Sequence, residues 1–201
     1  MKQFTENPQK ILSSIKTSLS NAVKDRKHGF HLPIFTNLTK NGGISSRIVV
    51  LRKFNPNNNL INFHTDKRSK KISELTKNPK TYFVFYDFKE KIQLRLNTIS
   101  KVNYKNQVSS ESWEKTKLSS RKCYLSKKKP GSISNIAEDG IEYHLIGVDP
   151  KKNESELGYK NFAVIENKII SIDWLYLSSS GHRRLSIKLD NKDVEFNWII
   201  P

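Results

Sequence analysis

From residue 30 onward, apolar and polar residues alternate in a series of short runs, and turn-forming residues separate the runs. An alternation of period two places successive side chains on opposite faces of a β-strand. Turn signals such as Asn41-Gly42-Gly43 recur at short intervals, which favours antiparallel strands joined by tight turns. Pro33 lies inside the first run, and its missing backbone N–H predicts an edge strand there. We expect strands over residues 30–38, 44–54, 59–65, 81–88, 91–104, 161–170, 171–180, 183–189 and 196–201.

Helical periodicity is confined to three segments. In residues 6–28, apolar residues recur three and four positions apart, which is typical of an amphipathic helix. Asn7 before Pro8 suits the first turn of this helix, and Gly29 suits its end. Two further helices are expected over residues 68–77 and 109–125.

The length of 201 residues fits one domain, and no internal repeat or linker divides the chain. Many short, turn-linked strands predict a closed antiparallel sheet or barrel. The expected fold class is therefore mainly β, of the α+β kind, with flanking helices. Within a single domain over 1–201 we expect an N-terminal helix (1–29), core strands (30–105), a helix and loop region (106–160) and C-terminal strands (161–201).

The chain is strongly basic, with 36 Lys and Arg residues against 19 Asp and Glu, a formal net charge of +17. Such a charge attracts nucleic acid, phosphate-bearing ligands or anionic membranes. Alternatively, the excess is compositional, because Lys greatly outnumbers Arg and is scattered along the chain as on a solvated surface. We favour the second interpretation, which makes nucleic acid the less favoured partner.

The single cysteine and the lack of long apolar runs bear on the cellular compartment of the protein. Cys123 is the single cysteine, so no disulfide can form within the chain, which suits a reducing cytosol. The N-terminus lacks the apolar stretch of a signal peptide, and no run is long enough to span a membrane. We therefore expect a cytoplasmic protein without a membrane partner or a metal site.

A cluster of cations follows the strand that ends near Phe63. Lys67, Arg68, Lys70 and Lys71 lie around the expected start of the helix over residues 68–77. Positive charge at a helix N-terminus opposes the helix dipole, but an anion bound there would be stabilised by both the backbone N–H groups and the cations. The alternatives at this point are a phosphate site and a solvated patch of lysines.

The sequence resembles the pyridoxamine 5'-phosphate oxidase family of FMN-binding split barrels, and a short oxidase-like branch of it in particular. The resemblance rests on RIVVLRKF, NFHTDKRSKKISELTKNPKTYFVFYD and IQLRL, in this order and spacing. It continues in Trp174, in GHRRL with His182 and Arg184, and in the ending FNWIIP. It covers roughly residues 30–105 and 170–201.

The resemblance implies a homodimer with FMN bound at the subunit interface. Arg47 and Lys71, with Lys70 beside them, would bind the flavin phosphate, while Trp174 and Arg184 would come from the other subunit. Arg52 would meet both flavin and substrate. The cofactor-binding residues implied are Arg47, Ile48, Val49, Val50, Leu51, Arg52, His64, Thr65, Lys70, Lys71, Gln93, Trp174 and Arg184.

The implied substrate contacts are Arg52, Arg121 and His182, and no catalytic acid or base can be named. Ser180 stands where the oxidase has an arginine that orients its vitamin B6 substrate. The resemblance therefore supports a flavin site and an FMN-dependent oxidoreductase acting on a small molecule more strongly than it supports B6 oxidation. The alternatives are a flavin-binding or redox-sensing protein without turnover, and a basic nucleic-acid-binding barrel.

Overall fold

Antiparallel strands make up most of the computed structural model, which describes residues 6–190 and 193–201. The strands are β1 (Ile34–Leu38), β2 (Ile44–Ile48), β3 (Lys53–Asn55), β4 (Leu60–Asp66), β5 (Lys80–Asp87), β6 (Ile92–Asn103), β7 (Phe162–Tyr176), β8 (Arg183–Leu189) and β9 (Val194–Ile199). The α-helices are α1 (Pro8–Lys24), α2 (Lys70–Lys77), α3 (Gln107–Glu114), α4 (Leu118–Arg121) and α5 (Lys152–Glu156). Single 3-10 turns occur at Lys122–Leu125, Tyr143–Leu145 and Tyr159–Asn161.

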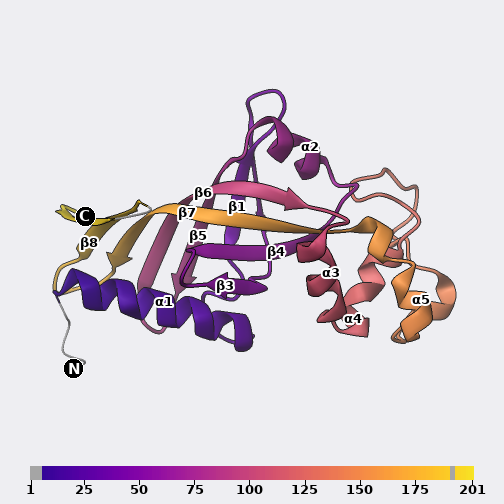
Figure 1. Cartoon of the computed structure of the whole chain (residues 1–201), viewed down its shortest axis with the longest axis horizontal. Coiled ribbons are helices and arrows are strands. Elements are labelled where there is room, and N and C mark those ends of the chain that lie inside the picture. Colours follow the sequence, from indigo (N-terminus) through magenta and orange to yellow (C-terminus); the bar gives the residue numbers. More distant parts are fainter. Residues whose placement is uncertain (1–5, 191–192) are drawn as a thin grey trace.

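The sheet divides at its longest strand, β7 (Figure 1). The strand order is β2-β1-β5-β6-β7-β4-β3, and β8 and β9 branch from β7. One edge of β7 pairs with β6 along its length, whereas the other edge pairs first with β4 and then, from Ser171, with β8. Since β4 and β8 pair with different stretches of the same edge of β7, the sheet separates there into a β4–β3 part and a β8–β9 part, and the described strands do not close into a barrel. The expected mainly β fold with flanking helices is confirmed, but the expectation of a closed sheet is wrong.

Several strand boundaries also differ from expectation. The strand after Pro33 is not an edge strand, because β1 begins one residue later and pairs with both β2 and β5. Residues 44–54 form two strands because the segment changes partner: the backbone N–H groups of Val49 and Leu51 still bond to the residues before β1, whereas that of Arg52 bonds to Asn62 and β3 pairs with β4. Residues 161–180, expected as two strands, contain the single strand β7, in which the buried side chain of Asn167 bonds to neighbouring backbone.

The helix expected over residues 109–125 is interrupted between α3 and α4. The buried side chain of Arg121 explains the interruption, because it donates to the carbonyl oxygens of Trp113 (2.8 Å) and Thr116 (3.0 Å). These bonds satisfy backbone acceptors that an unbroken helix would have used itself. Trp113 packs with Tyr124, Phe162 and Val164 in a small second core that anchors this region to β7.

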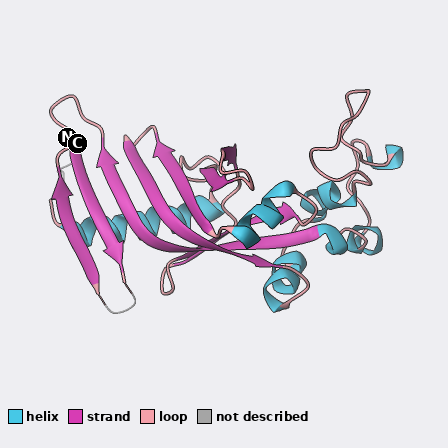
Figure 2. Ribbon diagram, turned by 90° about the horizontal axis from the view of Figure 1, so that it is seen from above, coloured by secondary structure: helices cyan, strands magenta, loops and turns pink. Residues whose placement is uncertain are grey.

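The main core lies between the sheet and α1. Ile11, Ile15, Leu19 and Ala22 form the buried stripe of this helix, which Asn7 caps as expected. The stripe belongs to one hydrophobic cluster with the inward side chains of the strands, including Phe35, Phe63, Phe83 and Phe85. Figures 1 and 2 show α1 lying across one face of the sheet, with α3, α4 and α5 at the end away from β8 and β9.

The opposite face of the sheet leaves apolar side chains exposed over β1, β2, β5 and β9. Strand register places Ile48, Ile34, Val84, Arg95 and Asp173 in one row across this face. A second row consists of Tyr86, Gln93, Leu175, Arg184 and Ile199. Ile48 is 66% exposed and Ile34 43%. We call this surface, defined by the two rows, the outer sheet face.

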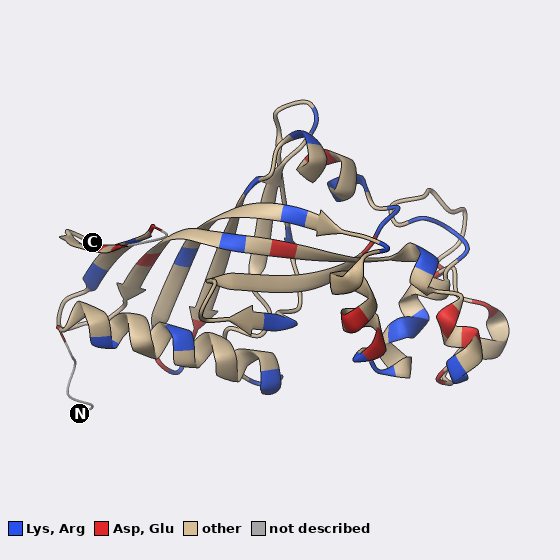
Figure 3. Ribbon diagram, in the orientation of Figure 1, with Lys and Arg blue, Asp and Glu red and all other residues tan. Residues whose placement is uncertain are grey.

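Charged residues are distributed unevenly (Figure 3). Lys and Arg occur on most helices and strands, whereas several of the acidic residues gather on α3 and α5, where Glu111, Glu114, Glu154 and Glu156 lie. Among the described residues, no helix is long and apolar enough to cross a membrane.

Candidate functional site

Three of the predicted phosphate ligands line one cleft at the N-terminal end of α2. The cleft has a volume of about 770 Å³ and includes Arg47 of β2 together with Ser69, Lys70 and Lys71. Pro130 and Gly131 reach it from the long loop region. The strand and helix that carry these groups are far apart in sequence but converge here. We call this cavity the α2 cleft.

The turn between β4 and α2 explains which of the clustered cations reach the α2 cleft. Asp66 ends β4 and accepts from both the backbone N–H (2.7 Å) and the guanidinium (2.7 Å) of Arg68. The ammonium group of Lys67 lies 3.6 Å from the ring centroid of Tyr104. Two of the four cations therefore stabilise the turn and its surroundings, which leaves Lys70 and Lys71 for the cleft.

Arg47 and Lys71 are partly buried and hydrogen-bonded to neutral oxygens. Arg47 donates to the side-chain oxygens of Asn37 and Ser45. Lys71 donates to Thr65 (2.9 Å) and Ser69 (3.1 Å). Burial lowers the pKa of both groups, and the charge of Arg47 lowers the pKa of Lys71 further. An anion in the cleft would offset both effects.

The first turn of α2 is itself suited to an anion. Ser69 is its N-cap residue, but the Ser69 side chain makes no capping hydrogen bond, and no acidic residue lies in the first turn. The backbone donors there are therefore not satisfied by a side-chain cap. Glu74 also lines the cleft, one turn farther along, and accepts from Asn37 (2.9 Å). Sequence reasoning missed Ser69, Asn37 and Ser45, although the N-cap position of Ser69 was a usable signal.

The segment predicted to line the flavin ring, residues 48–51, leads from β2 toward β3. Ile48 points to the outer sheet face, and Val49 and Val50 are half-buried. Leu51 is an exception to the prediction, because its side chain is buried in the main core and only its backbone can face a ligand. Thr65, next to His64 on β4, is held by Lys71.

The remaining predicted cofactor residues lie away from the α2 cleft. Gln93 and Arg184 lie in the second row of the outer sheet face, and Arg184 forms a two-pronged ion pair with Asp173 (Nη2 to Oδ2, 2.8 Å). Trp174 is buried in the main core. His182 lines a groove beside Arg184, Trp198 and Ile199. Within one chain, the predicted cofactor residues therefore fall into two separate groups, one in the α2 cleft and one on or near the outer sheet face.

Arg121, predicted to contact substrate, is buried, and its side chain bonds to neighbouring protein groups. It is 5% exposed and donates to Ser155 (3.1 Å) and Glu156 as well as to the two carbonyls at the α3–α4 interruption. With its nitrogens occupied in this way, the side chain holds α3, α4 and α5 together. We therefore no longer assign it a substrate contact.

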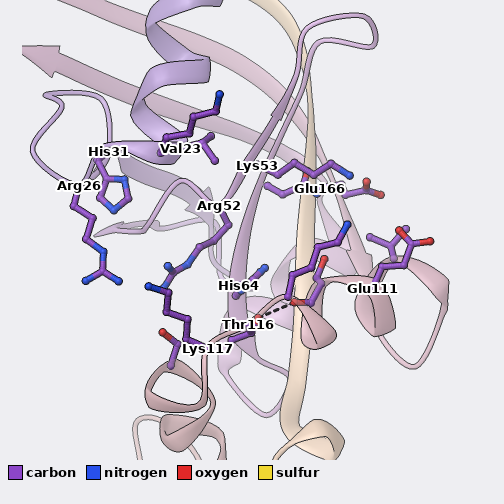
Figure 4. Close-up of a pocket in the computed structure, with 16 residues that line it drawn as sticks. Val23, Arg26, His31, Arg52, Lys53, His64, Glu111, Thr116, Lys117 and Glu166 are labelled. Atoms are coloured by element: carbon purple, nitrogen blue, oxygen red, sulfur yellow. Dashed lines mark hydrogen bonds between the residues drawn. The ribbon is translucent and has the colours of Figure 1, made fainter.

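A second cleft, of about 530 Å³, contains Arg52 and His64 (Figure 4). We call it the α3 cleft, because α3 and the residues after it form one wall. The end of α1 forms the other wall. His64 packs edge-on against Phe162, with ring centroids 4.8 Å apart. Burial, reinforced by the charge of Arg52, lowers the pKa of His64 to about 4, so its imidazole is neutral at pH 7. Among the described residues, no group of three or more His, Cys, Asp or Glu side chains could hold a metal ion.

Comparison with known proteins agrees with this architecture. Residues 12–103 match the family model of the pyridoxamine 5'-phosphate oxidase FMN-binding domain. A pyridoxamine 5'-phosphate oxidase-related, FMN-binding protein from Nostoc punctiforme superposes with a TM-score of 0.74 at 16% identity, covering 98% of this chain and 100% of that one. PhzG from Burkholderia lata, solved with tetrahydrophenazine-1-carboxylic acid, superposes with a TM-score of 0.72 at 15% identity, covering 100% and 99%. No curated protein sequence matched the chain.

The family model spans the segment that carries Arg47, the β4–α2 turn and Gln93, and the solved structures extend the likeness in fold over nearly the whole chain. Residues 12–103 are therefore similar to the FMN-binding domain of pyridoxamine 5'-phosphate oxidase, and the chain as a whole has the split-barrel fold of its structural relatives.

Proposed function

We propose that this protein is an FMN-binding oxidoreductase whose flavin phosphate binds in the α2 cleft. The convergence of Arg47, Lys70 and Lys71 on a helix N-terminus without a side-chain cap carries the proposal. A phosphate there would gain charge-assisted hydrogen bonds from the cations together with the backbone donors of the helix. The family match of the same segment supports FMN as the source of that phosphate.

In this proposal the protein supplies binding and orientation. Arg47 and Lys71 hold the phosphate, with Asn37, Ser45 and Thr65 fixing their side chains. Residues 48–51 place the ring along the strand segment that leaves the cleft. Bound FMN would accept and pass on the electrons of the reaction, because the redox chemistry resides in the cofactor.

We further propose a homodimer, formed through the outer sheet face, that completes the site. That face exposes apolar side chains and carries Gln93 and Arg184, the predicted cofactor residues that one protomer keeps away from the α2 cleft. Two copies meeting there would bury the apolar rows and bring both groups of residues to one ligand. The chain would act as a single domain over residues 1–201, with the site completed by its partner.

Fewer residues are proposed to contact the substrate than to contact the cofactor. Arg52 and His182 are its proposed contacts, and no side chain stands out as a catalytic acid or base. A small molecule bound near Arg52 would reach residues 48–51 directly along the chain. The second candidate function is a flavin-binding or redox-sensing protein without turnover, which would use the same α2 cleft.

Absorbance and turnover measurements separate these possibilities. Purified protein incubated with FMN and then desalted is expected to keep a flavin absorbance band in proportion to protein. Peroxide formed with pyridoxamine or pyridoxine 5'-phosphate would identify an oxidase, whereas bound flavin that is never reduced by substrate would favour the sensing function. If the protein keeps no FMN but binds nucleic acid at physiological salt, the basic nucleic-acid-binding barrel becomes the better explanation.

A further inference from the structure

Asp173 is the carboxylate at the centre of a charged cluster on the outer sheet face. It lies on β7 and accepts hydrogen bonds from two arginines on the neighbouring strands, Arg95 of β6 and Arg184 of β8. The bond to Arg184 is two-pronged, from Nε to Oδ1 (3.1 Å) and from Nη2 to Oδ2 (2.8 Å). The three side chains are only 23–30% exposed, so they lie within the surface of the sheet.

The pair with Asp173 fixes the orientation of the Arg184 guanidinium. A planar guanidinium that donates through two nitrogens to one carboxylate is held in a single plane, although its side chain is long. The pair occupies Nε and Nη2, and among the described residues Nη1 enters no hydrogen bond, so that nitrogen is available to a ligand. The hydrogen bond from Asp173 also raises the pKa of Arg184, which keeps the guanidinium charged.

The cluster keeps an excess of positive charge. Two guanidinium charges and one carboxylate charge leave a net +1, and no second carboxylate lies within 4.0 Å of Arg95 or Arg184 in the part of the chain that the structure describes. Tyr82 of β5 lies within electrostatic range of all three groups, but burial raises the pKa of its phenol, so it adds no negative charge at pH 7. Such a charge, in a surface proposed to be buried between two copies, is costly unless it faces an anionic or electron-rich group.

We propose that Asp173 is a positioning residue, which presets Arg184 for the flavin bound by the partner subunit and limits the charge that this flavin meets to +1. The inference rests on the proposed function, because Arg184 reaches FMN only if two copies meet at the outer sheet face. Reduction by two electrons and one proton leaves a negative charge on the flavin ring, so a cation beside the ring favours the reduced form. Asp173 and Arg95 would thus tune the reduction potential through the charge around Arg184.

Two substitutions that change the cluster charge in opposite directions test this role in the full chain loaded with FMN. Asp173→Asn raises the net charge from +1 to +2, whereas Arg95→Gln lowers it to 0 and keeps the pair with Arg184. We expect Asp173→Asn to favour reduced over oxidised FMN about tenfold more than wild type does, which is about 30 mV for a two-electron couple. Arg95→Gln should shift the ratio about as far in the opposite direction. Dithionite titration against a reference dye, followed by absorbance, measures the potential.

Affinity and two control variants separate position from charge. The Kd of oxidised FMN should rise about fivefold in Asp173→Asn, the effect of one net hydrogen bond, because Arg184 is no longer held, and should stay unchanged in Arg95→Gln. Asp173→Glu keeps the charge and should return the potential to that of wild type. Glu154→Gln removes a carboxylate from α5, at the end of the molecule away from β8, and should leave both quantities unchanged.

The outcomes distinguish this inference from the proposed function. Potentials that equal that of wild type in both charge variants, or that shift in the same direction, would overturn the role of Asp173 and leave the flavin site intact. A merely structural contribution of the cluster would loosen both variants alike and could not produce opposite shifts. Wild-type protein that takes up no FMN would instead refute the proposed function, and the inference with it.

Discussion

Arg47 and Lys71 are cations held in places that disfavour their charge. Partial burial lowers the pKa of each, and their mutual repulsion adds to that effect for Lys71. Their hydrogen-bond partners are neutral oxygens, which orient the side chains without neutralising them. Such an arrangement is costly in an empty cleft and favourable around a phosphate.

Removal of either cation should therefore weaken flavin binding. Arg47→Ala and Lys71→Ala are each expected to raise the Kd for FMN about tenfold to a hundredfold, because a charge-assisted hydrogen bond contributes about 1.5–3 kcal/mol. Fluorescence quenching of FMN on binding measures this directly. Lys77→Ala, at the other end of α2, is the matched control and should bind FMN like wild type. If both cleft variants bound FMN with unchanged affinity, the proposal that the FMN phosphate binds in the α2 cleft would be wrong.

His64 should make the fold sensitive to mild acid. Its pKa falls from an ordinary 6.5 to about 4 in the folded chain. Below pH 6.5 the unfolded state takes up a proton that the folded state refuses until about pH 4, so stability is lost across that window as the pH falls. The loss amounts to at most about 3 kcal/mol. Urea unfolding at pH 7 and pH 4.5 should show a smaller decline for His64→Gln, and an equal decline would exclude this cause.

The two buried asparagines should respond oppositely to the same substitution. Asn167→Val removes three hydrogen bonds and leaves their partners unpaired, which is expected to cost roughly 2–4 kcal/mol of stability. Asn62→Val removes an amide oxygen that has no partner among the residues the structure describes, so the ligand-free protein should be equally stable or more stable. Thermal unfolding of the two variants without ligand compares them. A large loss of Tm in Asn62→Val would mean that the amide is already satisfied.

Among the elements, the α3–α5 region depends on tertiary contacts more than on helix propensity. Its helices are short, with eight residues in α3, four in α4 and five in α5. Helices of this length are not stable alone. Arg121 joins them by bonding to α3, to the α3–α4 junction and to Glu156 of α5.

Arg121→Ala should accordingly loosen this region. We expect a loss of about 3 kcal/mol, since the substitution leaves buried acceptors unpaired. Hydrogen exchange should accelerate over residues 107–125 while β5 and β6 stay protected. Lys122→Ala, which removes a half-buried lysine from the next position, is the control. Exchange spread evenly over the sheet would show instead that Arg121 supports the whole fold.

At the scale of the whole molecule, the proposed dimer interface on the outer sheet face determines whether a single chain can bind FMN. Ile34→Arg and Ile199→Arg place a charge in the exposed apolar rows, and each is expected to shift the sedimentation coefficient from dimer to monomer and to release FMN. Ile146→Arg, at an exposed apolar position outside that face, should change neither. A wild-type chain that sediments as a monomer with FMN bound would refute the proposed interface.

The sequence by itself determined the classes of element and pointed to the cations that line the α2 cleft. Local alternation identified the strands, the Asn7-Pro8 pair marked the start of α1, and the basic cluster pointed to the start of α2, because these signals act over a few neighbouring residues. The resemblance to the oxidase family rested on ordered motifs and was confirmed by the family model over residues 12–103.

The tertiary structure alone decided where the sheet opens and which polar groups are free. Strand pairing joins residues far apart in the chain, so no local pattern revealed that β4 and β8 share one edge of β7. For the same reason, sequence could not tell that the side chain of Arg121 is buried and hydrogen-bonded, while the amide oxygen of Asn62 has no partner within residues 6–190 and 193–201. Whether a polar atom is satisfied depends on every neighbour that folding brings to it, and those neighbours come from the whole chain.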